Sequence, residues 1–266
     1  IGAEGTLGVI TGAVLKLFPL PKTQLTCWLN VGSPDAAVNL INAAKTQFDA
    51  QLTAFELVSE TALGLVLSHI PDTQRPTEAS PWYVLAEFSD ADPVALEQWL
   101  AARLESGEVS DGVIAQSALQ AKKLWALREN ISEAQKIEGV SIKHDVSVPV
   151  ASIPEFLTRA DAALSKAFPG IRFVSFGHVG DGNLHYNLSK ANKQENSQFI
   201  ASQPDVNRIV HDLVHELCGS ISAEHGLGQL KREEVLRYKS ATEMDLMRAV
   251  KKVLDPHGLM NPGKVV

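Results

Sequence analysis

The chain has 266 residues, of which 45% are hydrophobic and 21% charged, and its formal net charge is −7. This composition is ordinary for a globular protein of one large or two small domains. The acidic balance argues against nucleic acid as a partner, because phosphates require a basic surface. No apolar run approaches the roughly 18 residues of a membrane span. Two distant cysteines, Cys27 and Cys218, give no disulfide framework, so a cytoplasmic setting is expected, which leaves room for peripheral association with a membrane.

Residues 1–21 combine a glycine-rich turn with an apolar strand that ends at Pro19 and Pro21. The chain starts at Ile1 and this stretch looks like the end of another domain, so we expect a fragment of a longer protein. The fragment would expose an apolar surface where the other domain packs, which favours self-association. A homodimer is one form that this would take.

Strands and helices alternate between residues 23 and 117. Strand patterns cover 23–31, 52–57, 82–88 and 109–117, and helices follow the capping residues Ser33 and Asp92 and cover 59–68. This order predicts an α+β fold of ferredoxin-like type, in which helices flank an antiparallel sheet. Towards the C-terminus, Ser240 and Glu243 form the pattern of a capping box for a last helix that ends at Leu254.

A helix is expected over 118–138, with Arg128 and Ser132 four residues apart on one face. A strand is expected over 141–149, in which Lys143 and Asp145 point the same way. An arginine and a lysine on adjacent elements would suit an anionic ligand. The alternative is that Arg128 is a solvated surface charge.

Residues 171–189 read as two short strands around Gly180-Asp181-Gly182-Asn183. If Asp181 and Gly182 form a two-residue type I′ turn, His178 lies directly opposite His185, close enough for both imidazoles to hold one metal ion. Asn187 then follows on the same face as His185. The alternative is a pair of ordinary sheet histidines beside a tight turn.

A second short stretch, residues 222–228, adds Glu224 and His225 among glycines. Two histidines and a glutamate with an open position are a recognised catalytic metal set. Residues 190–203 are polar and expected as a surface loop, and a helix is expected over 205–218. The latter carries His211-Asp212-Leu213-Val214-His215, one substitution from a helical zinc-protease motif, which leaves a metal-dependent hydrolase as one alternative.

Four segments together resemble the FAD-linked 2-hydroxyacid dehydrogenases of the vanillyl-alcohol-oxidase type: residues 3–11 (AEGTLGVIT), 177–185 (GHVGDGNLH), 223–226 (AEHG) and 261–264 (NPGK). The family includes D-lactate dehydrogenase, the glycolate oxidase flavin subunit and D-2-hydroxyglutarate dehydrogenase. The resemblance implies that residues 1–21 end a truncated FAD-binding domain. Residues 22–218 would be an α+β substrate (cap) domain, and residues 219–266 a C-terminal helical segment that returns to the flavin site.

The resemblance also assigns roles to residues. Those that match the ligands of a divalent metal, usually zinc, are His178, His185 and Glu224. The position that matches the catalytic base is His225. Those that match substrate contacts are Arg128, Ser132, Lys143 and Asn187, with serine at 132 where some members have threonine. Those in segments that face the FAD are Gly5, Thr6, Gly8 and Asn261.

The function implied is the FAD-dependent, metal-assisted oxidation of a D-2-hydroxyacid to the 2-oxoacid, with hydride transfer to the flavin and an electron acceptor that the sequence does not identify. The fragment alone is expected to be inactive, because most of the flavin site lies elsewhere. The alternative from another class is a ferredoxin-like ligand-binding or regulatory module with a structural metal. A structural metal site is closed by four protein ligands, whereas a catalytic one keeps an open position.

Overall fold

The computed structural model describes residues 1–190 and 193–266. The chain divides into two compact units. Unit 1 comprises Ile1–Leu20 and Ile221–Val266, and unit 2 comprises Pro21–Ser220. The first and last of the three segments expected from the sequence therefore belong to one unit, and the α+β segment forms the other. The roles expected for these segments stay predictions.

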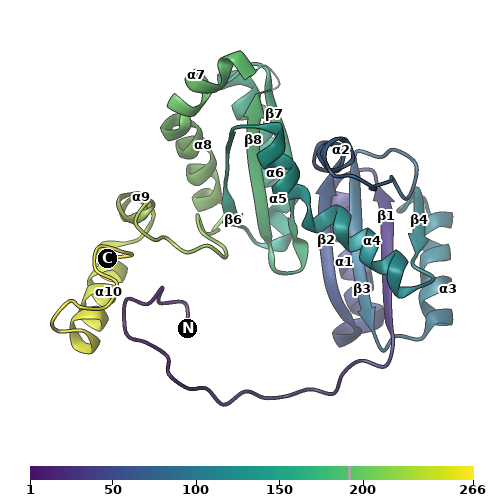
Figure 1. Cartoon of the computed structure of the whole chain (residues 1–266), viewed down its shortest axis with the longest axis horizontal. Helices are drawn as coiled ribbons and strands as arrows, with labels where there is room; N and C mark the ends of the chain where they lie inside the picture. The colour runs from purple at the N-terminus through teal and green to yellow at the C-terminus, as the bar shows by residue number, and fades with distance from the viewer. Residues whose placement is uncertain (191–192) are drawn as a thin grey trace. The chain divides into compact units, whose positions relative to one another are not determined.

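Unit 2 is built on an antiparallel sheet whose eight strands all lie in the described part of the chain (Figure 1). The strands are β1 (Gln24–Val31), β2 (Leu52–Ser59), β3 (Trp82–Ser89), β4 (Asp111–Ile114), β5 (Ser141–Ile142), β6 (Asp145–Ser147), β7 (Ile171–His178) and β8 (Asn183–Lys190). Their order is β4-β1-β3-β2-β7-β8-β5, and β6 also pairs with β8. The predicted antiparallel sheet flanked by helices is confirmed.

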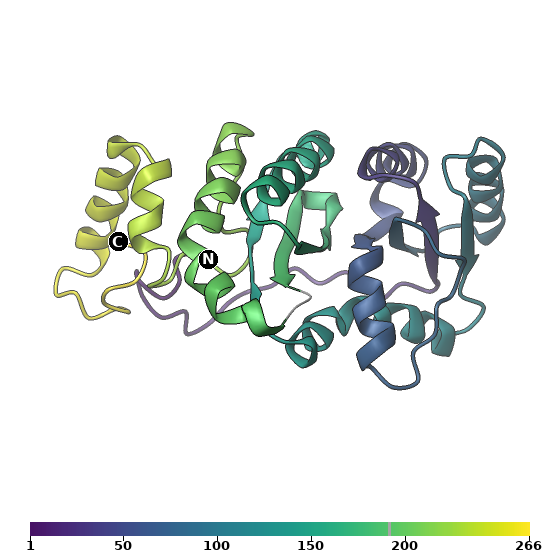
Figure 2. The same cartoon turned by 90° about the horizontal axis from the view of Figure 1, so that it is seen from above.

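Helices cover both faces of this sheet (Figure 2). One face carries α1 (Pro34–Phe48), α3 (Pro93–Glu105) and α6 (Ile153–Ala167), and the other carries α2 (Glu60–His69), α4 (Ala118–Glu129) and α5 (Ile131–Glu138). Helix α8 (Gln203–Glu216) packs on α6 and follows α7 (Asn196–Ala201). Short 3-10 turns are η1 (Asp49–Gln51), η2 (Val150–Ser152), η3 (Val179–Asp181) and η4 (Lys193–Glu195). The expected caps of α1 and α3 are confirmed, since Ser33 and Asp92 accept hydrogen bonds from backbone N–H groups of the first turn.

A separate apolar core lies on each face of the sheet. On one face, Phe48 of α1, Phe88 of β3 and Trp99 of α3 meet edge to face, with ring centroids 4.9 to 6.3 Å apart. On the other, Trp28, Tyr83 and Phe176 are buried together with apolar residues of α2, α4 and α5. The second core is important for the site because β7 carries Phe176 two residues before His178.

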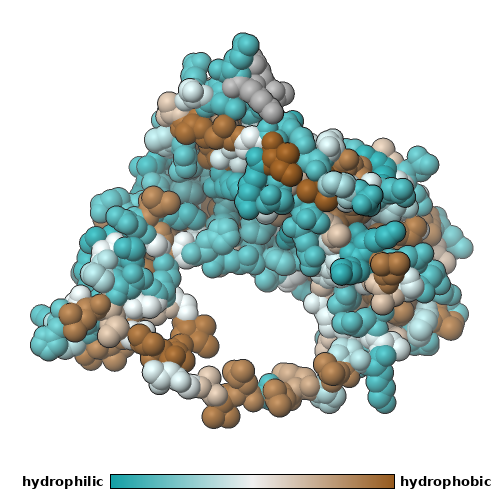
Figure 3. Space-filling model, in the orientation of Figure 1, coloured by the Kyte–Doolittle hydropathy of each residue, from teal (hydrophilic) through white to brown (hydrophobic). Residues whose placement is uncertain are grey.

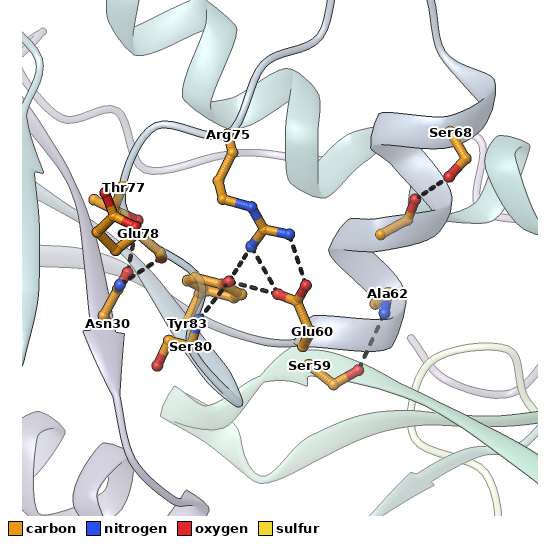
Figure 4. A network of polar contacts seen from close by, with 11 residues as sticks. Asn30, Ser59, Glu60, Ala62, Ser68, Arg75, Thr77, Glu78, Ser80 and Tyr83 are labelled. Carbon is orange, nitrogen blue, oxygen red and sulfur yellow. Dashed lines mark hydrogen bonds and ion pairs between the residues drawn. The ribbon is translucent and has the colours of Figure 1, made fainter.

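The proline-rich loop between α2 and β3 is fastened to the sheet by polar contacts (Figure 4). Arg75 donates to both carboxylate oxygens of Glu60, at 2.6 and 2.8 Å, and Glu60 also accepts from the hydroxyl of Tyr83. Asn30 of β1 accepts from Thr77 at 2.7 Å and donates to the carbonyl of Glu78 at 2.8 Å. The carboxylate of Glu60 thus anchors the loop, and Arg75 holds its pKa below the ordinary value although burial opposes this.

Four expectations about elements are wrong. Residues 1–21 form no strand, although an apolar strand is expected there from the sequence. The single helix over 118–138 is broken at Asn130, whose side chain donates to the carbonyl of Ala126 at 2.8 Å, the same carbonyl that accepts from the N–H of Asn130. The strand over 141–149 is split, because the N–H of His144 donates to the side chain of Asn187 at 3.2 Å. The loop over 190–203 contains α7; residues 191–192 of that prediction lie outside the described residues.

Unit 1 contains α9 (Arg232–Tyr238) and α10 (Ala241–Leu254). The predicted capping box is confirmed, since Ser240 and Glu243 exchange side-chain and backbone hydrogen bonds at 3.2 and 2.8 Å. After α10, Asp255 pairs with Lys251 and accepts from the N–H groups of Met260 and Leu259, which lowers the pKa of its carboxyl to about 2. Lys251 in turn donates to the carbonyl of Thr6 at 2.6 Å, so the two ends of the chain meet in this unit.

Residues 9–20 expose large apolar side chains, seen as brown atoms along this segment in Figure 3: Val9, Ile10, Val14, Leu15, Leu17, Phe18 and Leu20. This segment is a candidate for the apolar surface expected from the sequence, and self-association through it stays a prediction. None of the helices in residues 1–190 and 193–266 is both long and apolar enough to cross a bilayer.

Candidate active site

The β7–β8 hairpin places two histidines together, but with a register different from the one predicted. Phe176, not His178, pairs with His185. A type I′ turn needs positive φ at both central residues, and only Gly182 has it, at 82°. The connection is instead the single turn η3 followed by Gly182. The shift is two residues, which preserves the face of each side chain, and nitrogens of the His178 and His185 rings lie within 4.8 Å of each other.

A carboxylate lies at the Nδ1 side of each imidazole. Glu56 of β2 is paired with His178 in the strand register, and its Oε1 contacts Nδ1 of that ring. Asp145 of β6 is paired with His185, with Oδ1 at 3.9 Å from Nδ1. Metal-binding histidines commonly direct one ring nitrogen to a carboxylate, which fixes the ring and leaves the other nitrogen for the metal. The donor set of this face therefore fits the histidine part of a divalent-metal site.

Glu56 also connects the histidines to Arg128. The side chain of Glu56 is 2% exposed, and its Oε2 accepts from Nε of Arg128 at 2.7 Å. Burial opposes ionisation of Glu56, but the hydrogen bond from His178 and the charge of Arg128 outweigh it and hold the pKa below its ordinary value. The guanidinium of Arg128 lies over the ring of Phe176, 4.8 Å from the centroid.

Arg128 is thus a largely buried residue of the histidine face rather than a solvated charge, since its side chain is 12% exposed. Its Nε donates to Glu56, and the terminal Nη1 and Nη2 make no hydrogen bond to a residue that the structure describes. These two nitrogens can bind an oxyanion without breaking the contact with Glu56. The network joins a cation, a carboxylate and two imidazoles on one side of the sheet.

The other expected substrate contacts differ in their surroundings. Asn187 is 4% exposed and fully engaged, because its side chain accepts from His144 and donates to Gln135 at 2.9 Å. Ser132 and Lys143 are exposed, and neither side chain makes a hydrogen bond within residues 1–190 and 193–266. Lys143 lies between β5 and β6 rather than within a strand. Of this group, Arg128 and Asn187 are built into the histidine face of the sheet.

Sequence reasoning missed Glu56 and Asn183. Glu56 is the one charged residue within the apolar run of β2, and a lone carboxylate in such a strand was the available signal. Asn183 begins β8 and is 3% exposed, and both polar atoms of its side chain lack a hydrogen-bond partner among the described residues. An unsatisfied buried carboxamide is costly. Asn183 lies two residues before His185 in β8, so we expect both side chains on the same face of the sheet.

Glu224 and His225 lie in unit 1, in a loop without regular secondary structure. The four residues expected to face the flavin also belong to unit 1. Asn261 donates to the carbonyl of Glu4 at 2.7 Å and lies 3.9 Å from the position of a Cβ on Gly5. Thr6 is 3% exposed and donates to the carbonyl of Ala3 at 2.7 Å. Nothing lies within 4 Å of a Cβ placed on Gly8.

The alternative site on α8 has little support. His211 is 2% exposed and packs edge to face against His144, with centroids 5.7 Å apart, whereas His215 is exposed. Neither histidine belongs to a group of three metal-ligating side chains within the described part of the chain. A hydrolase built on these two residues would need further ligands from outside that part.

The chain matches the family model for FAD linked oxidases, C-terminal domain, over residues 20–265. It is 41% identical over 269 residues to a D-2-hydroxyglutarate dehydrogenase of Xanthomonas citri pv. viticola, covering 100% of this chain and 56% of the relative. It is 35% identical over 271 residues to a mitochondrial D-2-hydroxyglutarate dehydrogenase of Arabidopsis thaliana, covering 100% and 47%. The chain spans about half the length of these relatives.

Solved structures share the fold at low sequence identity. p-Cresol methylhydroxylase with substrate bound matches with a TM-score of 0.63 and 13% identity, over 93% of this chain and 53% of that one. Alkyldihydroxyacetonephosphate synthase matches with a TM-score of 0.59 and 15% identity, over 98% and 49%. At these identities the likeness concerns the fold alone.

Proposed function

Because the chain belongs to the family of FAD linked oxidases, C-terminal domain, we propose that it is the substrate-binding part of an enzyme that oxidises a D-2-hydroxyacid to the 2-oxoacid. The observation that carries the proposal is the network of Arg128, Glu56 and His178, with His185 beside it. It offers a cation for a carboxylate and imidazoles for a metal on one face of the sheet. The relatives named as D-2-hydroxyglutarate dehydrogenases make D-2-hydroxyglutarate the first substrate to test.

Arg128 binds the carboxylate next to the reacting carbon. Its two Nη atoms are suited to both oxygens of a carboxylate, while Nε stays bound to Glu56. Glu56 and Phe176 fix the guanidinium, so that little side-chain entropy is lost when substrate binds. Lys143 and Ser132 add donors to the anion from the neighbouring segments, and Asn187 exchanges one of its internal hydrogen bonds for a substrate oxygen.

His178, His185 and Glu224 hold a divalent cation, with zinc as the first candidate. Two neutral imidazoles and a carboxylate are a donor set for zinc, manganese, cobalt or iron. The contact of Nδ1 of His178 with Glu56 supports this assignment, because it leaves Nε2 of His178 for the metal. When bound, the metal polarises the 2-hydroxyl group of the substrate and lowers its pKa.

His225 accepts the proton of the 2-hydroxyl group, the role of general base that histidine most often takes in enzymes. When bound, FAD supplies the acceptor for the hydride that leaves the α-carbon. Loss of the hydroxyl proton and of the hydride together leaves a carbonyl group at C2, which is the 2-oxoacid. Gly5, Thr6, Gly8 and Asn261 lie in the segments that face the flavin.

Replacing Arg128 tests the role of the network in the full-length, FAD-loaded enzyme. Arg128→Ala should raise the KM for D-2-hydroxyglutarate by about 10- to 100-fold, because it removes charge-assisted hydrogen bonds worth about 1.5–3 kcal/mol. The matched control is Lys122→Ala, an exposed cation on the same helix. FAD content and melting temperature of each variant show whether the fold is kept. Unchanged KM and kcat in Arg128→Ala would exclude this role.

A further inference from the structure

Glu4 makes an unusual set of contacts with the loop that carries Glu224 and His225. One carboxylate oxygen accepts from the N–H of Leu227 at 2.7 Å, and the other accepts from the N–H of Gly228 at 2.7 Å. Both residues follow His225 within three positions. The two acceptors of one carboxylate thus match two consecutive backbone donors, which is a strong, directional arrangement.

The backbone on both sides is adapted to this contact. A Cβ on Gly226 would lie 2.5 Å from Cδ and Oε1 of Glu4, so the carboxylate occupies the space that any other side chain would need. Gly226 also has φ of 78°, a left-handed conformation that favours glycine. Glu4 itself has φ of 51° and is held there by the hydrogen bond from Asn261 to its carbonyl.

Other contacts also reach this loop: the side chain of Lys231 donates to the carbonyl of Ile221 at 2.6 Å, and its N–H donates to the carbonyl of Leu227 at 3.0 Å. Residues 221–228 form no helix or strand, so their backbone positions depend on individual contacts. Ser222 donates to the carbonyl of Gly226 at 2.5 Å, and Val265 donates to the carbonyl of Gly228 at 3.0 Å. Among the N–H groups after His225, those of Leu227 and Gly228 are satisfied by Glu4.

We propose that Glu4 is a positioning residue: its carboxylate fixes the backbone after His225 and thereby sets where the His225 imidazole and the Glu224 carboxylate stand. This role rests on the proposed function, in which His225 is the base and Glu224 a metal ligand. It couples the first residues of the chain to the reaction through unit 1. Small displacements of a general base or of a metal ligand slow the chemical step strongly. The contact should therefore affect turnover more than substrate binding.

Glu4→Gln in the full-length, FAD-loaded enzyme tests the role. Glutamine keeps the length but replaces one acceptor oxygen with an NH₂ group, which would face a backbone N–H. We expect kcat for D-2-hydroxyglutarate to fall about 10- to 100-fold, with a much smaller change in KM. Bound divalent metal should fall below one equivalent, and amide hydrogen exchange in the peptide 222–228 should accelerate. FAD content and melting temperature should stay close to those of the parent.

Two further variants make the test specific. Glu233→Gln removes an exposed carboxylate of α9 in the same unit and should match the parent in every readout. Gly226→Ala perturbs the contact from the loop side and should reproduce the loss in kcat and metal. It decides the question alone if Glu4→Gln does not fold. A Glu4→Gln enzyme that folds and has parental kcat and metal content would overturn the proposal.

Glu224→Ala and His225→Ala separate this proposal from the proposed function. If both are inactive while Glu4→Gln behaves as the parent, only the positioning role is wrong. If both retain parental kcat and metal content, the proposed function itself is wrong, and the positioning role is overturned with it.

Discussion

Buried carboxylates determine how the imidazoles of the candidate site are held. Glu56 contacts His178 and Arg128 at once, and Asp145 lies beside His185. Removing one partner of such a network would leave a charge or a polar group unsatisfied in the interior. The polar residues of this face therefore depend on one another, and single substitutions should affect ligand binding and stability together.

Asp161 makes the free energy of unfolding depend on pH. It accepts a hydrogen bond from the hydroxyl of Tyr186 at 2.6 Å. Burial raises the pKa of its carboxyl to about 6, although this hydrogen bond acts in the opposite direction. Between about pH 4 and 6 the folded chain then binds the proton more tightly than the unfolded chain does. The free energy of unfolding should fall as pH rises through this window.

Asp161→Asn should remove this pH dependence, which changes the free energy of unfolding by on the order of 2 kcal/mol between about pH 4 and 6. Urea unfolding at pH 4, 5 and 6 measures it by tryptophan fluorescence, because Trp28, Trp82, Trp99 and Trp125 all lie in unit 2. Glu97→Gln, at an exposed position of α3, is the control and should keep the slope. The same slope in Asp161→Asn and the parent would contradict the assignment.

Secondary structure elements show what sequence patterns can and cannot predict here. Caps at Ser33, Asp92 and Ser240 are local signals, and the helices begin where those signals predict. The split of the strand at His144 involves a hydrogen bond to the distant Asn187, which local patterns do not contain. The hydrogen bond of Asn130 is local, four residues back in the chain, but the apolar pattern alone does not reveal it. Elements were therefore more predictable than their interruptions.

The hairpin illustrates the same limit for the site. The Asp-Gly pair correctly predicted a turn between two strands that carry His178 and His185. It did not predict the register, because η3 adds a turn before Gly182. Glu56 is distant in sequence from both histidines, so its contact with His178 depends on the order β2-β7 in the sheet. The placement of both histidines in one hairpin could be predicted, but not the network that joins His178 to Glu56; the roles of these residues stay predictions.

Gly182 should be a sensitive position of this hairpin. Its φ is 82°, and a Cβ would approach the carbonyl oxygen of Val148 to 2.0 Å. Gly182→Ala should therefore lower the free energy of unfolding by about 2–4 kcal/mol, through backbone strain and overlap. Urea unfolding followed by tryptophan fluorescence measures the change.

Gly64→Ala is a control in which the free energy of unfolding should change in the opposite direction. Gly64 lies inside α2 with ordinary φ and nothing within 4 Å of an added Cβ. Alanine there should raise the free energy of unfolding by about 0.5–1 kcal/mol, because glycine is a poor helix former. A Gly182→Ala protein as stable as the parent would mean that the turn tolerates a side chain and relaxes.

At the scale of the whole molecule, the residues expected to act in catalysis are distributed over both units. Unit 2 carries the sheet with Arg128, His178 and His185, and unit 1 carries Glu224, His225 and the segments expected at the flavin. No periodicity in the sequence relates residues 1–20 to 221–266, so their association in one unit could not be predicted from local patterns. The resemblance to flavoenzymes was the signal that connected these segments. The family match over residues 20–265 confirms the resemblance, and the roles of the segments stay predictions.

Metal content of the purified protein tests the central claim, that His178, His185 and Glu224 hold one catalytic metal. Elemental analysis of the parent should give about one equivalent of divalent metal. Both His178→Ala and Glu224→Ala should lose it, since each removes one of three protein ligands. His257→Ala, an exposed histidine of unit 1, should retain it. Metal that is absent from the parent, or unchanged in both ligand variants, would contradict the account.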